Sequence, residues 1–473
     1  MSQNPFREEK DEMNELLRQF DNLKNGRSHS FLEEESFERI INYFDENEDL
    51  NQAMEAAEIG IEIYPYSSLL LIKKADLLLA QRKYQEALWI LEKAELLDSN
   101  DINLFILKTD AYLALDQQTK AIELLEEALT LFKNEERIEL LFELADVYDD
   151  YEEFEKVFDC LKLILEEEPL NEEALYKICF WTDFTGRNEE SIRLHLKILD
   201  EHPFSELAWF NLGAAYQGLK LYEKAIDAYM YSTAIDEKFD YAYRNMGDAY
   251  IRMRKYKDAI EMLEKVLELS RPEEVIHEAI GYCYDKLAQY AQARFHYRKA
   301  SHLNPEDSRV YYKIAVTYLN EGHYEKAIKS LTQALKINRM HPDYNLIMGM
   351  ALKELGNYSE ALEYFSTVVK VKPKNIKGWS AMIECLLRSE SFEEAEKVTD
   401  AGFEATGGKP VFIFYKAAAL FSAGKFKQAL LALEQALGQA PRQFKKFLEL
   451  VPVGLQHPQI VDLLARYKKT KNN

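Results

Sequence analysis

The sequence of 473 residues predicts an all-α solenoid built from antiparallel helix pairs. Three observations indicate this fold. Alanines recur every 34 residues, the apolar residues within each period follow helical spacing, and no stretch alternates apolar and polar residues convincingly as a strand would. One such period holds two helices of about three to four turns. Because a single pair cannot bury its apolar face alone, stacked pairs are expected to share a continuous core.

The period is clearest at alanines that follow a tyrosine or phenylalanine by three positions. These alanines are Ala225, Ala259, Ala293, Ala327, Ala361, Ala395 and Ala429. The same step finds Ala53, Ala87 and Ala121 upstream, then Val157 and Ser191, with two extra residues near 134–137. Twelve units are predicted to start at Glu34, Ser68, Ile102, Ile138, Glu172, Glu206, Asp240, Glu274, Ser308, Pro342, Ile376 and Pro410.

Small residues mark a second recurring place, eight residues into the unit. Four units have glycine there: Gly213, Gly247, Gly281 and Gly349. Glycine within a helix costs about 1 kcal/mol relative to alanine, so we expect a neighbouring backbone to approach closely at this place. The first unit has Ile41 there, and the eleventh has Ile383 and later Thr399. These two units are therefore expected to pack differently.

The sequence resembles the tetratricopeptide repeat family, from about Glu34 to about Gln443. The best unit shows the pattern at Trp209, Leu212, Gly213, Tyr216, Ala225 and Tyr229. The resemblance implies a right-handed superhelix whose inner surface is lined by the first helix of each unit. We expect an N-terminal helical cap in residues 1–33, tandem repeats in 34–443, and C-terminal capping helices with a tail in 444–473.

Aromatic side chains gather at the inward-facing places that the family resemblance implies. Phe142, Tyr176 and Phe210 share one place in three successive units, Arg244 follows, and Phe180 and Phe184 lie one and two turns after Tyr176. Any one of them could be core, but the run of three favours a groove. Asn211 and Asn245 share the next place and could hold a peptide backbone, or be solvated. The predicted partner-binding groove is Phe142, Tyr176, Phe180, Phe210, Asn211, Arg244 and Asn245.

Some family members clamp the C-terminal carboxylate of a chaperone with lysine and asparagine one turn apart. In this chain Phe210 with Ala214, and Arg244 with Asp248, stand at those places. A carboxylate clamp is therefore not expected.

The charge is uneven along the chain, with a net value of −23. Residues 1–250 have 56 acidic and 25 basic side chains, and residues 251–473 have 26 and 34. Such a chain repels nucleic acid and anionic membrane, so neither is an expected partner. The acidic half could steer a basic protein or peptide, or simply keep the surface soluble. The opposite charges of the two halves also leave a homo-oligomer possible.

No catalytic, cofactor-binding or metal site is predicted. The sequence lacks phosphate loops, zinc-protease helices and nucleophile elbows, and its four cysteines have no shared spacing. His195 takes a core-pattern place and is expected to be packed. The flanks are too short for an enzymatic domain. No apolar stretch approaches a secretory signal or a membrane span, so a cytoplasmic location is expected.

We therefore interpret the chain as a non-enzymatic protein–protein interaction scaffold or adaptor that binds a partner segment in its groove. A self-assembling structural spacer and a peptide-responsive regulatory sensor are the alternatives. RNA binding is disfavoured by the acidic charge.

Overall fold

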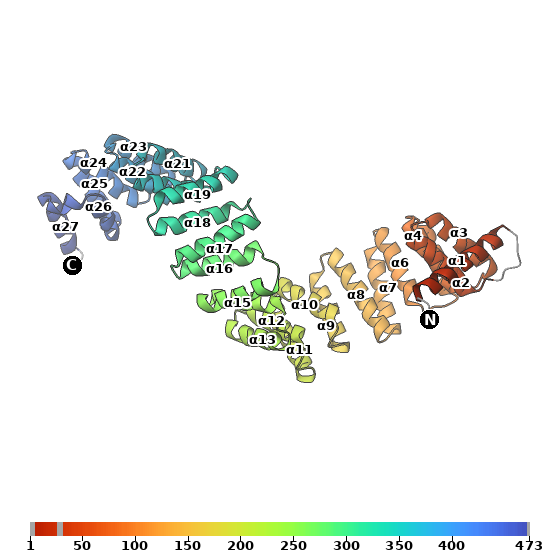
Figure 1. Ribbon diagram of the computed structural model, residues 1–473. Helices are drawn as coiled ribbons and strands as arrows, with labels where there is room; N and C mark the ends of the chain where they lie inside the picture. The colour runs from red at the N-terminus through yellow and green to blue at the C-terminus, as the bar shows by residue number, and fades with distance from the viewer. Residues whose placement is uncertain (1–4, 26–31, 471–473) are drawn as a thin grey trace. The chain divides into compact units, whose positions relative to one another are not determined.

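A computed structural model describes residues 5–25 and 32–470 of the chain (Figure 1). Within these residues the chain forms 27 α-helices and two short 3-10 helices, and no strand. The all-α prediction is confirmed. The chain divides into two compact units, Met1–Asp236 and Glu237–Asn473, which we describe separately.

The first unit contains the helices α1 to α13, shown from red to yellow-green in Figure 1. Their bounds are α1 Pro5–Lys24, α2 Glu34–Glu46, α3 Leu50–Ile63, α4 Ser68–Ala80, α5 Tyr84–Glu95, α6 Ile102–Ala114, α7 Gln118–Leu131, α8 Glu135–Asp150, α9 Phe154–Glu167, α10 Glu172–Thr185, α11 Asn188–Glu201, α12 Glu206–Gly218 and α13 Tyr222–Ile235.

The second unit contains the helices α14 to α27 and the two 3-10 helices. Their bounds are α14 Asp240–Arg252, α15 Tyr256–Leu269, α16 Glu274–Lys286, α17 Tyr290–Leu303, α18 Ser308–Asn320, α19 Tyr324–Ile337, α20 Pro342–Glu354, α21 Tyr358–Val371, α22 Ile376–Arg388, α23 Phe392–Ala405, α24 Val411–Ser422, α25 Phe426–Gln439, η1 Pro441–Gln443, α26 Phe444–Leu450, η2 Pro452–Gln456 and α27 Pro458–Thr470.

The first helix begins at the predicted residue in ten of the twelve units. The largest departure is α8, which begins at Glu135 instead of Ile138. The extra residues near this point join the helix, because Glu135 and Glu136 place two negative charges in its first turn, where the helix dipole favours them. The other departure is α24, which begins one residue late, after Pro410.

At three of the four recurring glycines, the close neighbour that leaves no room for a side chain is an aromatic ring and not a backbone. A Cβ atom added at Gly281 would lie 2.7 Å from Cδ1 of Tyr297, and one at Gly349 would lie 2.5 Å from Cε1 of Phe365. Each ring belongs to the second helix of the same repeat, sixteen residues further along. The expected backbone approach was therefore wrong, and the close neighbour is a side chain.

The first helices of successive repeats pack on one another within each unit. In the first unit α2 contacts α4, α4 contacts α6, α6 contacts α8 and α10 contacts α12. In the second unit α18, α20, α22 and α24 form a similar series. Each unit therefore presents a layer of first helices and a layer of second helices, which follows from burying one apolar face of each helix.

The helices beyond the predicted repeats pack onto the terminal pairs. Phe20 of α1 is fully buried and meets the ring of Phe37 edge-on, with centroids 6.4 Å apart. In the second unit Phe447 of α26 is buried in one cluster with Phe414. The division of the chain into caps and repeats stays a prediction, and its residues 1–4, 26–31 and 471–473 lie outside the described residues.

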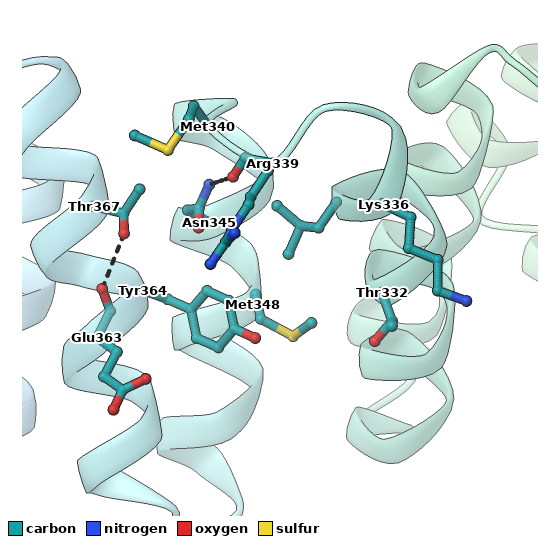
Figure 2. A pocket seen from close by; sticks show the side chains of 10 residues that line it. Thr332, Lys336, Arg339, Met340, Asn345, Met348, Glu363, Tyr364 and Thr367 are labelled. Carbon is teal, nitrogen blue, oxygen red and sulfur yellow. Dashed lines mark hydrogen bonds between the residues drawn. The ribbon is translucent and has the colours of Figure 1, made fainter.

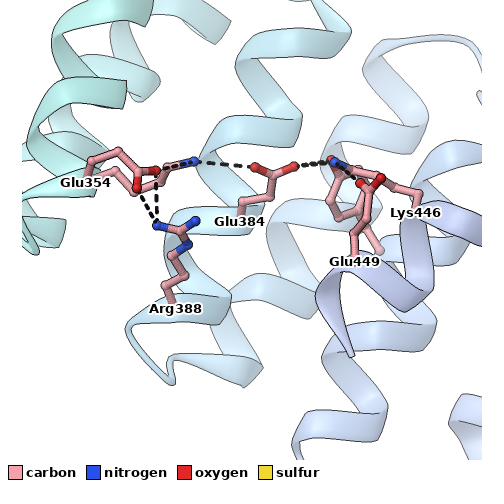
Figure 3. Close-up of polar contacts among 7 residues, drawn as sticks. Glu354, Glu384, Arg388, Lys446 and Glu449 are labelled. Carbon is pink, nitrogen blue, oxygen red and sulfur yellow. Dashed lines mark hydrogen bonds and ion pairs between the residues drawn. The ribbon is translucent and has the colours of Figure 1, made fainter. Parts of the chain in front are cut away.

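An ion-pair network holds α26 to the first helices of the second unit (Figure 3). The Glu384 carboxylate accepts from Nζ of Lys446 at 2.9 Å and from the Tyr415 hydroxyl at 2.7 Å. Its other oxygen lies 3.4 Å from Nζ of Lys353, a lysine that is only 6% exposed. Three first helices, α20, α22 and α24, thus share one half-buried acid with α26.

Candidate functional site

Three aromatic side chains form an exposed stripe along α10 in the first unit. Tyr176, Phe180 and Phe184 follow one another at steps of four residues, so they lie on one face of the helix. Their exposed fractions are 58%, 60% and 57%. We call these three residues the aromatic stripe. Large apolar side chains gathered on a soluble surface are typical of interaction sites.

The opposite face of α10 anchors the helix in the core. Leu175, Ile178 and Trp181 are buried, and α10 packs against α9 and α12. The Asn171 side chain accepts a hydrogen bond from the Ala174 amide at 3.0 Å and so caps the helix start. Burial on one face and a defined cap therefore fix the direction of the aromatic stripe.

Neighbouring aromatic rings pack against the aromatic stripe. The rings of Phe180 and Phe184 stack with centroids 5.8 Å apart, and Phe184 meets Phe154 of α9 edge-on at 4.8 Å. Phe154 also stacks on the buried Trp181 at 5.3 Å. Sequence reasoning missed Phe154 and Trp181. The signal for Phe154 was its place three residues before Val157, where other repeats have tyrosine or phenylalanine.

Phe142, on the preceding first helix α8, lies beside α10. It is half-buried, and Nζ of Lys177 lies 5.0 Å from its ring centroid. The Lys177 ammonium also pairs with Glu173 at 2.8 Å and with Asp146 of α8 at 3.7 Å. Lys177 thus links Phe142 and Asp146 of α8 to α10, the helix that carries Tyr176 and Phe180.

Phe210 and Asn211, on α12, are more buried than the groove prediction implied. Phe210 is half-buried, with its ring 5.6 Å from that of the fully buried Tyr229. Asn211 is 3% exposed, and its amide donates a hydrogen bond to the carbonyl of Leu175 at 2.8 Å. Asn211 therefore ties α12 to α10. It is neither a solvated side chain nor an exposed amide that faces a peptide.

Arg244 and Asn245 belong to the second unit, on α14. Both are half-buried. The Arg244 guanidinium pairs with Glu273 at 2.9 Å and lies 6.0 Å from the ring of Tyr241. The structure therefore places the predicted groove residues in two separate units.

Four carboxylates run across the first helices of the first unit. Asp45, Asp76, Asp110 and Glu143 lie on α2, α4, α6 and α8, and we call them the acidic row. Desolvation raises the pKa of Asp76, and the charge of Asp45 raises it further. The pKa of Asp110 is raised by desolvation and by the charge of Asp76. Desolvation raises the pKa of Glu143 too, with Asp110 the next largest cause. The carboxylates are thus electrostatically coupled from helix to helix.

A pocket lies in the second unit (Figure 2). It has a volume of 630 Å³ between α19, α20 and α21, and contains no residue of the predicted groove. Its lining is Thr332, Leu335, Lys336, Arg339, Met340, Asn345, Met348, Glu363, Tyr364 and Thr367.

The residues with potential reactivity are buried or dispersed. In the described ranges, no group of three histidine, cysteine or acidic side chains is placed to hold a metal. Burial raises the pKa of the Cys160 and Cys283 thiols to about 12, so both stay protonated at neutral pH. His195 is fully buried, as its core-pattern place predicted. No helix in residues 5–25 or 32–470 has the length and apolar character to cross a bilayer.

Two family models match the chain and define its class. The model described as Tetratricopeptide repeat protein 21 C-terminal ARM domain matches residues 213–355, and the model described as Tetratricopeptide repeat matches residues 352–410. The fold is therefore that of a helical-repeat protein. With the 34-residue period and the paired helices, these matches identify the chain as a tetratricopeptide repeat protein.

Several solved structures are similar to parts of the chain. YrrB, described as a TPR protein with an unusual peptide-binding site, is 21% identical with a TM-score of 0.36, and the match covers 40% of this chain and 96% of YrrB. The C-terminal part of a TPR repeat-containing protein from Cytophaga hutchinsonii is 18% identical with a TM-score of 0.44, covering 54% and 99%. The Cut9–Hcn1 complex of the APC/C matches at 12% identity and a TM-score of 0.34, covering 85% and 97%. A comparison with curated proteins finds no match.

Proposed function

We propose that the chain is a non-enzymatic protein-interaction scaffold that holds a partner segment against the first helices of its first unit. The observation that carries this proposal is the aromatic stripe, three exposed rings on a helix whose opposite face is fixed in the core. Phe142, half-buried on α8, lies next to this helix, with its ring centroid 5.0 Å from Nζ of Lys177. Aromatic side chains supply large contact area with few rotatable bonds, and so they dominate many protein interfaces.

Of the groove predicted from the sequence, Phe142, Tyr176 and Phe180 form the contact surface in this proposal. Asn211 and Phe210 support it from within, because Asn211 is buried and Phe210 packs on Tyr229. Arg244 and Asn245 belong to the second unit and are not included in this surface. The matched YrrB is described as having a peptide-binding site, which agrees with this assignment of function.

The test replaces Tyr176, Phe180 and Phe184 with serine and captures partners from extract of the native cell. We expect a specific partner to be lost from the variant, because about 1–4 kcal/mol of binding energy is typical of a buried aromatic anchor. A photo-reactive phenylalanine analogue at position 180 then identifies the partner segment that lies against the stripe.

The control variant carries three serines at exposed apolar residues of the second helices α9, α11 and α13: Leu163, Leu196 and Met230. It removes similar apolar area from the other helix layer and should retain the partner. Equal capture by the stripe variant and the wild type would reject the proposal. Recovery of the chain alone with every bait would favour the structural spacer.

A further inference from the structure

The carboxylates of the acidic row have no ion-pair partner among the described residues. Within the described part of the chain, no lysine or arginine lies within ion-pair distance of Asp45, Asp76, Asp110 or Glu143. Some other acids of the same unit are paired, for example Glu58 with Lys74 at 3.0 Å. Burial is the main reason that the pKa values of Asp76, Asp110 and Glu143 are raised, and the charge of a neighbouring carboxylate raises each of them further. Lys73 and Lys177 offset only part of this effect at Asp76 and Glu143.

The acidic row and the aromatic stripe lie on successive first helices of the first unit, α2, α4, α6, α8 and α10. Asp76, Asp110, Asp146 and Phe180 occupy the same place in four successive repeats. Their helices α4, α6 and α8 pack in series, and Lys177 joins α8 to α10 through Asp146 and the ring of Phe142. A bound chain that runs along the carboxylates therefore reaches the exposed rings next.

We infer that this surface binds a protein segment with lysine or arginine side chains along the acidic row and an aromatic or large aliphatic side chain on the stripe. The inference rests on the proposed scaffold function and specifies its partner. Charge complementarity selects the occupant, because the first unit is strongly acidic and none of the four row carboxylates forms an ion pair within the described residues. Nucleic acid would be repelled by the same charges.

Geometry sets the spacing of the basic residues in an extended partner. Packed helices lie about 8–10 Å apart, and an extended chain advances about 3.3–3.6 Å per residue. One cation at about every third residue would therefore meet one carboxylate per repeat. Exposed ion pairs contribute little individually, so the row steers the segment and fixes its register, and the rings supply most of the affinity.

The binding test uses the full chain and a labelled synthetic peptide of about twelve residues that is designed to bind as an extended chain. The peptide has lysine at every third position and tryptophan at one end, and it is made in both orders. Affinity is measured by fluorescence anisotropy at about 50 mM and about 300 mM NaCl. We expect one order to bind more tightly, with affinity that falls at the higher salt concentration. No binding by either order at about 1 mM peptide and low salt would overturn the inference.

The acidic-row variant combines Asp76→Asn, Asp110→Asn and Glu143→Gln. We expect about tenfold weaker binding at low salt and a shallower salt dependence, from the loss of three charge interactions. The matched control combines Glu92→Gln, Glu123→Gln and Glu166→Gln, three exposed acids on the second helices α5, α7 and α9. Equal weakening by the two variants would show only a net-charge effect and would overturn the inference.

Two further outcomes separate this inference from the proposed function. If a native partner crosslinks to position 180 but binds the acidic-row variant at full affinity, the scaffold function stands and the basic-segment inference falls. If the wild-type chain forms dimers that the acidic-row variant loses and the control retains, the occupant is a second copy, which also overturns the inference. Loss of all crosslinking at position 180 rejects the scaffold function itself.

Discussion

A Cβ atom added at Gly213 would lie 2.6 Å from Cδ1 of Tyr229, on the facing helix of the same repeat. No real Cβ atom sits so close to a ring, and the Tyr229 ring is fully buried, so the ring fills the space that a side chain at position 213 would need. The first repeat reverses this arrangement, with Ile41 at the glycine place and Ala57 at the ring place, both buried in one cluster. The glycine position and the ring position of a repeat thus share a fixed volume, so that one residue can be large where the other is small.

The first prediction is that Gly213→Ala destabilises the first unit by about 1–2 kcal/mol, because overpacking outweighs the better helix propensity of alanine. Tyr229→Leu alone also destabilises, by leaving a cavity. The double variant reproduces the alanine–leucine combination of Ala145 with Leu161. We therefore expect the double variant to be more stable than the sum of the single effects predicts.

Hydrogen exchange of the α12 and α13 amides measures this coupling locally, which suits a repeat protein whose unfolding need not be two-state. Gly218→Ala serves as a comparison, because the added Cβ there would meet the Asn188 side chain and not a ring. Additive effects of Gly213→Ala and Tyr229→Leu would contradict the shared-volume explanation.

The second prediction concerns His195, which burial keeps neutral. Its Nδ1 lies 2.8 Å from the carbonyl of Ser191, and desolvation lowers the pKa of His195 to about 4. Because the unfolded chain binds the proton more tightly, stability falls as the pH drops from about 6.5 to about 4, by about 3 kcal/mol. His195→Leu should flatten this dependence, since leucine stands at this place in other repeats, such as Leu161.

Urea unfolding of the wild type and of His195→Leu at several pH values between about 4 and 7 checks this prediction. An unchanged pH slope in the variant would mean that other groups cause the acid sensitivity.

The third prediction is that Asp76→Asn stabilises the chain at pH 7, by up to about 1 kcal/mol. Desolvation and the charge of Asp45 raise the pKa of Asp76, so the folded state binds its proton more tightly than the unfolded state. This contribution to stability is present below the unfolded pKa and is lost as the pH rises. The midpoint of thermal unfolding should therefore rise in the variant at pH 7, and the difference should shrink at about pH 4. A lower midpoint at pH 7 would contradict the repulsion along the acidic row.

The fourth prediction is that Glu384→Ala destabilises the C-terminal end of the second unit by about 3 kcal/mol. Burial alone would raise the pKa of Glu384, but its bonds to Lys446 and Tyr415 lower it, so the acid is ionised and pairs with the buried Lys353. Removing the carboxylate leaves Lys353 with Glu354, at 3.8 Å, as its nearest acid. Faster hydrogen exchange in α26 than in α18 would reveal the released helix.

Arg388→Ala is the matched control, because it removes the exposed partner of Glu354 at 3.0 Å and leaves Glu384 in place (Figure 3). Similar exchange rates in both variants would show that Glu384 does not hold α26.

Sequence periodicity by itself determined the helical pairs of this protein. The alanine step and the helical spacing are local patterns, so they predicted the first residue of most first helices, among them Glu172 of α10 and Glu206 of α12. Tyr176 and Phe180 are exposed, whereas the sequence pattern alone left core packing open for each of them. The sequence could not separate Asn211 from them, because one helical position can face a groove or a neighbouring helix.

Only the tertiary structure decided the remaining features of the surface. The Leu175 carbonyl lies 36 residues before the Asn211 amide that binds it, and this pairing depends on how two helices pack. The ring of Phe154 on α9 contacts the ring of Phe184 on α10. The charges of Asp76 and Asp110 interact only because α4 and α6 lie side by side. Hydrogen bonds, ring contacts and charge coupling act over a few ångströms in space, whereas the sequence pattern records distance along the chain.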